Sequence, residues 1–125
     1  MLDLLQAGGA KIESQVTSRS GDRVDAVALI PGAERVLGPV LIEVKALQGR
    51  GLTEAVIQLM AFLGRGGGGV GLVVYDGPRQ EKGIISGWPV VLVLHIDELR
   101  ELVNNEALGS ILILARNAAV HGRIQ

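Results

Sequence analysis

The chain has no cysteine, which excludes disulfide scaffolds and thiolate metal sites. Aromatic residues are also scarce, at 2% of the chain, so the core has to be aliphatic. Hydrophobic residues nevertheless make up 48% of the sequence, and its β-branched members suit buried strands. A length of 125 residues fits one domain, which we expect to span residues 1–125.

An excess of positive charge is missing as well. Lys and Arg total 12 against 13 for Asp and Glu, for a formal net charge of −1. Proteins that bind nucleic acid through a broad basic surface are more positive than this. Any such binding would have to use a local cluster of Arg and Lys, metal ions or partner subunits.

The sequence also lacks long hydrophobic runs. Its first residues have neither the basic start nor the apolar stretch of a signal peptide. No apolar run approaches the roughly 20 residues that cross a bilayer. We therefore expect a soluble, cytoplasmic protein that does not contact membranes.

The residues that are present predict strands and helices in alternation. A helical turn at 2–7 precedes strands at 11–17 and 23–30, which a Ser-Gly-Asp turn joins into a hairpin. After a loop, a third strand covers 40–47. Thr53 is a good N-cap for an amphipathic helix over 54–63, which Gly64 ends.

The second half continues the pattern. Strands are predicted at 70–75 and 89–96, with a loop at 79–88 between them. Asp97 is expected to cap a helix that ends near Asn104. Residues 110–115 are apolar throughout, so periodicity leaves a final strand and a buried helix equally open. This order predicts an α/β fold with a mixed sheet flanked by helices.

Three charged residues interrupt otherwise apolar strands. They are Asp25 in the second strand and Glu43 and Lys45 in the third. Buried charges need partners or ligands. Glu43 and Lys45 are two residues apart and so point to one face, where Asp25 joins them if the strands pair.

Two carboxylates and a main-chain carbonyl are suitable ligands for Mg²⁺, for which Mn²⁺ can substitute. A metal there would activate a water, and an adjacent lysine would orient that water and offset transition-state charge. The same trio could also arise by chance, since Glu-x-Lys is a weak signal and a surface pair contributes little.

These residues resemble the PD-(D/E)XK nuclease superfamily, whose motif is an Asp on one strand and Asp/Glu-x-Lys on the next. Here the motif reads Val24-Asp25 and then Glu43-Val44-Lys45. On the following helix, Gln58-Leu59-Met60-Ala61-Phe62 is similar to the Gln-x-x-x-Tyr motif of RecB-type members. The resemblance covers roughly residues 10–75.

The resemblance implies a restriction-endonuclease-like fold with an αβββαβ core and a Mg²⁺-dependent endonuclease that cuts DNA. It implies that Asp25, Glu43 and the Val44 carbonyl bind the metal and that Lys45 assists the attacking water. Gln58 would help to place the water, the lysine or the DNA.

Three positions depart from the family pattern. Val24 stands in place of Pro, and Phe62 replaces Tyr and removes a hydroxyl. Many members also carry a Glu on a long first helix, which is abbreviated here. Glu13 falls on a predicted strand, so we do not expect it to act as that ligand.

Other motifs carry weaker signals. The Gly64–Gly69 segment contains G-x-G-x-x-G, but it follows a helix, the reverse of a dinucleotide site, and is interpreted as a loop. His95 fits a satisfied histidine in or at the end of the sheet, and with only His121 besides, zinc is not expected. Trp88 fits a packing or interface residue. Candidate phosphate contacts, with a solvated rim as the alternative, are Lys11, Arg19, Arg23, Arg50, Arg65 and Arg79.

Three functions of different classes follow. The first is the DNA nuclease, and the second is a non-catalytic assembly or nucleic-acid-binding module with the same fold. The third, a small-molecule nucleotide enzyme using the glycine cluster, is disfavoured by the reversed context. We expect a homodimer, and the sequence leaves open whether a larger protein partner delivers the domain.

Overall fold

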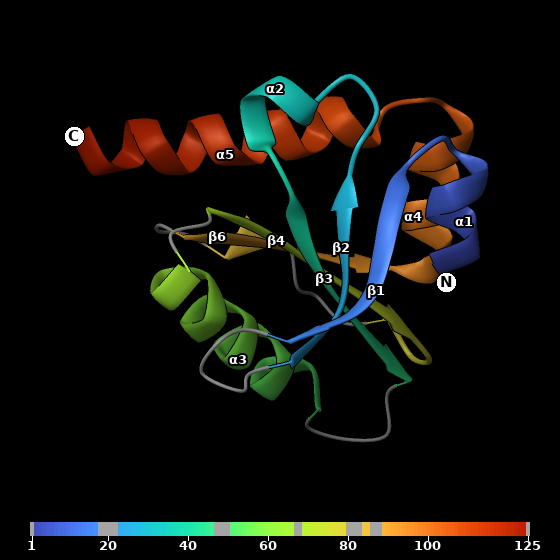
Figure 1. The fold of residues 1–125 in the computed structure, drawn as a ribbon, viewed down its shortest axis with the longest axis horizontal. Helices are drawn as coiled ribbons and strands as arrows, with labels where there is room; N and C mark the ends of the chain where they lie inside the picture. The colour runs from blue at the N-terminus through green and yellow to red at the C-terminus, as the bar shows by residue number, and fades with distance from the viewer. Residues whose placement is uncertain are drawn as a thin grey trace.

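The structure is a computed structural model that describes residues 2–17, 23–46, 51–66, 69–79, 84–85 and 89–124. Within these residues the chain forms a six-stranded mixed sheet in the order β1-β2-β3-β4-β6-β5 (Figure 1). Strand β2 is antiparallel to both of its neighbours, β1 and β3, whereas β3, β4 and β6 are parallel and β5 is antiparallel to β6. The strands are β1 Lys11–Thr17, β2 Arg23–Leu29, β3 Val40–Ala46, β4 Val70–Asp76, β5 Ile84–Ile85 and β6 Val90–His95.

Helices cover both faces of this sheet (Figure 1). One face packs against α3 alone, through an apolar cluster that includes Leu59, Leu63, Val73 and Val91. The other face packs against α1, α4 and α5, through a larger cluster. The helices are α1 Leu2–Ala7, α2 Glu34–Leu37, α3 Gly51–Gly66, α4 Ile96–Asn104 and α5 Leu108–Ile124. No helix in the described part of the chain is long and apolar enough to span a membrane.

The parallel strands occupy the centre of the sheet because they are buried on both faces. Every residue of β6 and all but the last of β4 are buried, which explains their continuous apolar runs. Strand β1 lies at an edge, and its exposed Lys11, Glu13 and Ser14 explain its polar composition.

Helix α3 lies unusually close to β4 at Gly71. A Cβ atom built on Gly71 would lie 2.7 Å from Leu59 Cδ2 and 3.1 Å from Leu63 Cδ1. Because both leucines are buried, they cannot easily move away from an added methyl group. Gly71 therefore sets the distance between the helix and the face of the sheet that carries Glu43 and Lys45.

The expected mixed α/β sheet with flanking helices is confirmed, as are the antiparallel hairpin and the strands at the centre. Residues 110–115, left open between strand and helix, belong to α5. Two short elements were not expected: α2 falls in the predicted 31–39 loop and β5 in the predicted 79–88 loop.

Two helix starts were placed wrongly. Helix α3 begins at Gly51, two residues before the expected Thr53 cap, and runs past Gly64 to Gly66. Helix α4 is capped by His95 rather than by Asp97, because strand β6 passes directly into the helix. The predicted Ser18–Asp22 turn and Trp88 lie outside the described residues.

Candidate metal centre

The site forms where β2 and β3 separate. Their antiparallel pairing runs from Ala28–Val40 to Ala26–Ile42 and does not continue to Asp25 and Glu43, the next residues in register. There the Asp25 side chain takes the place of a backbone acceptor. The backbone N–H of Val44 donates a hydrogen bond of 2.7 Å to Asp25 Oδ2. Asp25 is thereby tied to the strand that carries Glu43 and Lys45.

Glu43 and Lys45 both lie on the face of the sheet that α3 covers. Their partners on β4 are Val73 and Tyr75, which pack in the α3 cluster. Both side chains are half-buried, as is Asp25. Asp25 and Lys45 both act electrostatically on Glu43, so the three charged residues lie near one another, as expected.

The pKa of Glu43 is affected by burial and by the charges of Asp25 and Lys45. Burial raises the pKa of Glu43 above its ordinary value of 4.5, and the negative charge of Asp25 raises it further. The Lys45 ammonium and a hydrogen bond from the backbone of Asp25 lower the pKa, without cancelling the rise. The ionised form of Glu43 is therefore disfavoured, and a bound cation would favour it.

The Val44 carbonyl is suitably directed to join the two carboxylates. A strand residue directs its N–H and C=O toward the same neighbouring strand, and the Val44 N–H faces Asp25. The carbonyl therefore lies on the β2 side, at the level where β2 no longer pairs with β3. The described residues contain no group of three or more His, Cys, Asp and Glu side chains that could hold a metal ion. Two carboxylates, this carbonyl and waters would fit the partly hydrated octahedron that Mg²⁺ prefers.

Gln58 is on the expected helix but is not brought into contact with the three charged residues. Its side chain is exposed on α3 and makes no hydrogen bond with another described residue. Phe62, four residues later, is half-buried against the α3 cluster. Gln58 thus lies at the exposed flank of the helix, where a bound substrate rather than the protein would have to engage it.

The candidate phosphate contacts are scattered. Lys11 is exposed on β1, and Arg65 is exposed in the last turn of α3. Arg79 is paired with Glu98 at 3.4 Å. Arg19 and Arg50, and the side chain of Arg23, lie outside the described residues. A continuous basic track is therefore not seen in the part of the chain that the structure describes.

A Tyr75–His95 pair, which the sequence did not suggest as a unit, adjoins Lys45. Tyr75 is the β4 partner of Lys45 and His95 is the β6 partner of Tyr75, so the three form one row across the sheet. The two rings meet edge to face, with centroids 5.1 Å apart. This pair forms a rigid, buried wall beside the lysine.

His95 is satisfied at both ring nitrogens, as a histidine at the end of the sheet was expected to be. The Asp97 N–H donates to Nδ1, and Nε2 lies 2.9 Å from the Gly77 carbonyl oxygen. The ring thus caps α4 and donates through Nε2, which leaves no nitrogen for a metal. His121, expected in a polar tail, is instead an exposed residue of α5.

No protein-family model, curated protein or solved structure matches this chain. Its function is therefore inferred from the site itself.

Proposed function

We propose that this chain is a metal-dependent deoxyribonuclease of the PD-(D/E)XK type with a restriction-endonuclease-like fold. One observation carries the proposal. Asp25 and Glu43 meet where two strands separate, with Asp25 bonded to the Val44 amide and Lys45 two residues beyond Glu43. The order α1, β1, β2, β3, α3, β4 also follows the αβββαβ core, with α2 as an addition.

Asp25, Glu43 and the Val44 carbonyl would hold the metal, with Mg²⁺ as the natural ion and Mn²⁺ as a substitute. When bound, such an ion polarises a phosphoryl oxygen and lowers the pKa of a coordinated water. Lys45 would hold the attacking water on the α3 face and offset the charge that develops on the phosphate oxygens. Lys45 lies beside buried Tyr75 on β4, and its positive charge acts on Glu43.

Gln58 and the exposed basic residues would contact the DNA rather than the metal. Gln58 and Arg65 both project from α3, the helix that covers the site. Because the net charge is −1, we propose that a homodimer or a larger protein partner supplies further phosphate contacts.

A non-catalytic nuclease-fold module is the second candidate, and the position of α1 favours it. Helix α1 has six residues and packs against α4 and β1 on the face opposite α3. No carboxylate on α1 can therefore reach Asp25 and Glu43. Such a module would use the same surface to bind nucleic acid or to assemble without hydrolysis.

Cleavage assays separate the two candidates. The wild-type chain should cut at least one member of a panel of duplex, single-stranded and branched DNA with Mg²⁺ or Mn²⁺. Lys45→Ala should lower the rate by about 100-fold or more, since removal of one transition-state contact has effects of that order. Glu101→Gln, an exposed change on α4, is the matched control and should cut normally. A wild type that cuts nothing, or a Lys45→Ala chain as fast as the control, would reject the nuclease.

A further inference from the structure

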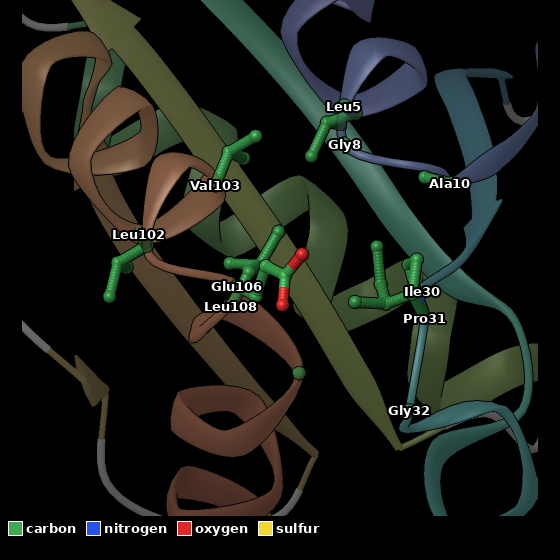
Figure 2. Close-up of a pocket in the computed structure, with 11 residues that line it drawn as sticks. Leu5, Gly8, Ala10, Ile30, Pro31, Gly32, Leu102, Val103, Glu106 and Leu108 are labelled. Carbon is green, nitrogen blue, oxygen red and sulfur yellow. The ribbon is translucent and has the colours of Figure 1, made fainter.

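A second site lies at the other end of the sheet, on the face away from α3. A cavity of about 370 Å³ opens between the end of α1, the segment after β2, the end of α4 and the start of α5 (Figure 2). Asp25 is near the start of β2, whereas Ile30 and Pro31, which follow β2, line the cavity. The cavity is thus separate from the candidate metal centre.

Two glycines hold the walls of this cavity together. A Cβ atom on Gly8 would lie 2.7 Å from Val103 Cγ1, which brings α1 against α4. A Cβ atom on Gly109 would lie 2.7 Å from the Pro31 carbonyl oxygen, which brings α5 against the segment after β2. These two close contacts hold together the four segments that bound the cavity.

Apart from Glu106, the side chains that line the cavity are apolar, and polar atoms of the backbone and of Glu106 make up about half of its accessible surface. The apolar side chains are mostly those of leucine, isoleucine, valine and proline, and Glu106 is the single charged residue among the lining residues. Figure 2 shows its carboxylate between the helix ends and the Ile30–Pro31 segment. Within the described part of the chain, Glu106 has no ion pair.

Glu106 is also held in a backbone conformation that favours glycine. Its φ is +54°, and it is the only non-glycine residue with positive φ among those described. It ends α4 in a Schellman motif, in which the Ala107 N–H donates to the Leu102 carbonyl and the Glu106 N–H donates to the Val103 carbonyl. Residues in such conformations concentrate at ligand-binding and other functional sites.

We propose that this cavity binds a small organic cation, an ammonium group carried on an apolar body. The apolar side chains would contact the body, and the carboxylate of Glu106, an exposed residue at the mouth of the cavity, would receive the ammonium. The volume is within the range of about 300–1,000 Å³ of small-molecule sites.

The test uses the full chain and two probes of nearly equal shape, phenethylammonium chloride and neutral 2-phenylethanol. Each is titrated into ¹⁵N-labelled protein, and backbone amide shifts are followed. The ammonium should shift the amides of residues around the cavity, including Gly8, Ala10, Gly32 and Gly109. It should bind about fivefold more tightly than the alcohol, because a charge contact contributes roughly 1 kcal/mol and that energy corresponds to about a fivefold ratio of dissociation constants.

Two variants at Glu106 make the result decisive. Glu106→Gln should bind both probes equally, because it keeps the shape and removes the charge. Glu106→Gly should do the same while melting at a higher temperature than wild type, which shows that it is folded. Glu101→Gln on the same helix should keep the preference for the ammonium. Equal binding of the two probes by wild type, shifts away from the cavity, or an unchanged preference in Glu106→Gln would overturn the proposal.

Discussion

At the residue scale, the candidate metal centre depends on the Asp25 side chain, which accepts a hydrogen bond that a backbone carbonyl would otherwise accept. Asp25 accepts the Val44 N–H where the β2–β3 pairing has ended, so one carboxylate oxygen satisfies the strand and the other stays available. A single residue thus links the association of β2 with β3 to the proposed metal binding.

Asp25 variants separate these two roles. Asp25→Ala leaves the Val44 N–H without its acceptor and should lower the free energy of unfolding by about 1–3 kcal/mol. Asp25→Asn keeps an acceptor oxygen and should stay within about 1 kcal/mol of wild type, while losing affinity for Mn²⁺. Urea unfolding in the presence of EDTA measures the first effect without metal. Equal destabilisation by the two variants would contradict the structural role of the hydrogen bond.

The ionised Glu43 carboxylate should lower the stability of the folded chain at neutral pH. Its pKa in the folded state is raised from the ordinary value of 4.5, so folding disfavours the ionised form. The folded state therefore loses stability as pH rises from 4.5 through the raised pKa. Glu43→Gln should melt roughly 1–3 °C higher than wild type at pH 7, a modest shift because the group is only half-buried.

The pH dependence of that comparison provides the check. Well below pH 4.5 the wild-type Glu43 becomes neutral in both states, so the difference in melting temperature should shrink as the pH falls toward that range. Differential scanning calorimetry in EDTA from pH 8 down to about pH 3 follows this trend. A Glu43→Gln chain that is less stable than wild type at every pH would show that the carboxylate is favourably paired.

At the scale of elements, α3 and β4 position the site through their close packing at Gly71. Gly71→Ala adds a methyl group 2.7 Å from Leu59 Cδ2 and should lower stability by about 1–3 kcal/mol. Leu59→Ala alone should cost about 2–5 kcal/mol, because Leu59 is buried.

The double variant tests whether the two residues act through one contact. In Gly71→Ala/Leu59→Ala the added methyl group enters the space that Leu59 leaves. Its destabilisation should be smaller than the sum of the single effects by about 1 kcal/mol or more. Strict additivity in urea unfolding would mean that Gly71 is needed for another reason.

How well the elements could be predicted depended on their length and pattern. Strands β2, β3 and β4 carry apolar runs and α3 carries a helical period, and all four were predicted. Helices of four residues such as α2 and strands of two such as β5 carry neither signal. The cap of α4 was misplaced because histidine is a rare cap, and only the structure shows the Asp97 N–H at 3.1 Å from its ring.

The site was predictable in part for the same reason. Alternation along a strand places Glu43 and Lys45 on one face whatever the rest of the fold does. The Asp25–Val44 hydrogen bond could not be predicted, because it depends on where two strands separate. The exposure of Gln58 depends on how α3 is rotated on the sheet, which its periodicity only approximates.

At the scale of the whole molecule, near-neutral charge sets how DNA could be bound. With a net charge of −1, the chain gains little from releasing counterions, the main source of non-specific affinity. The metal would then supply much of the attraction. DNA should bind at least about tenfold more tightly with Ca²⁺, used as an ion that need not support cleavage, than with EDTA.

Fluorescence anisotropy with a labelled duplex measures this ratio at fixed ionic strength. Lys45→Ala keeps both carboxylates and should retain most of the Ca²⁺ effect, whereas Asp25→Asn should lose it. Equal affinity in Ca²⁺ and EDTA would mean that DNA, if bound, is held by surfaces other than this site.

The most direct measurement is Mn²⁺ binding by isothermal titration calorimetry. One Mn²⁺ should bind per wild-type chain, the heat of binding should be lost in Glu43→Gln, and the Glu101→Gln control should bind like wild type. A wild-type chain that binds no Mn²⁺, or a Glu43→Gln chain that binds it as well as wild type, would contradict a metal centre at Asp25 and Glu43.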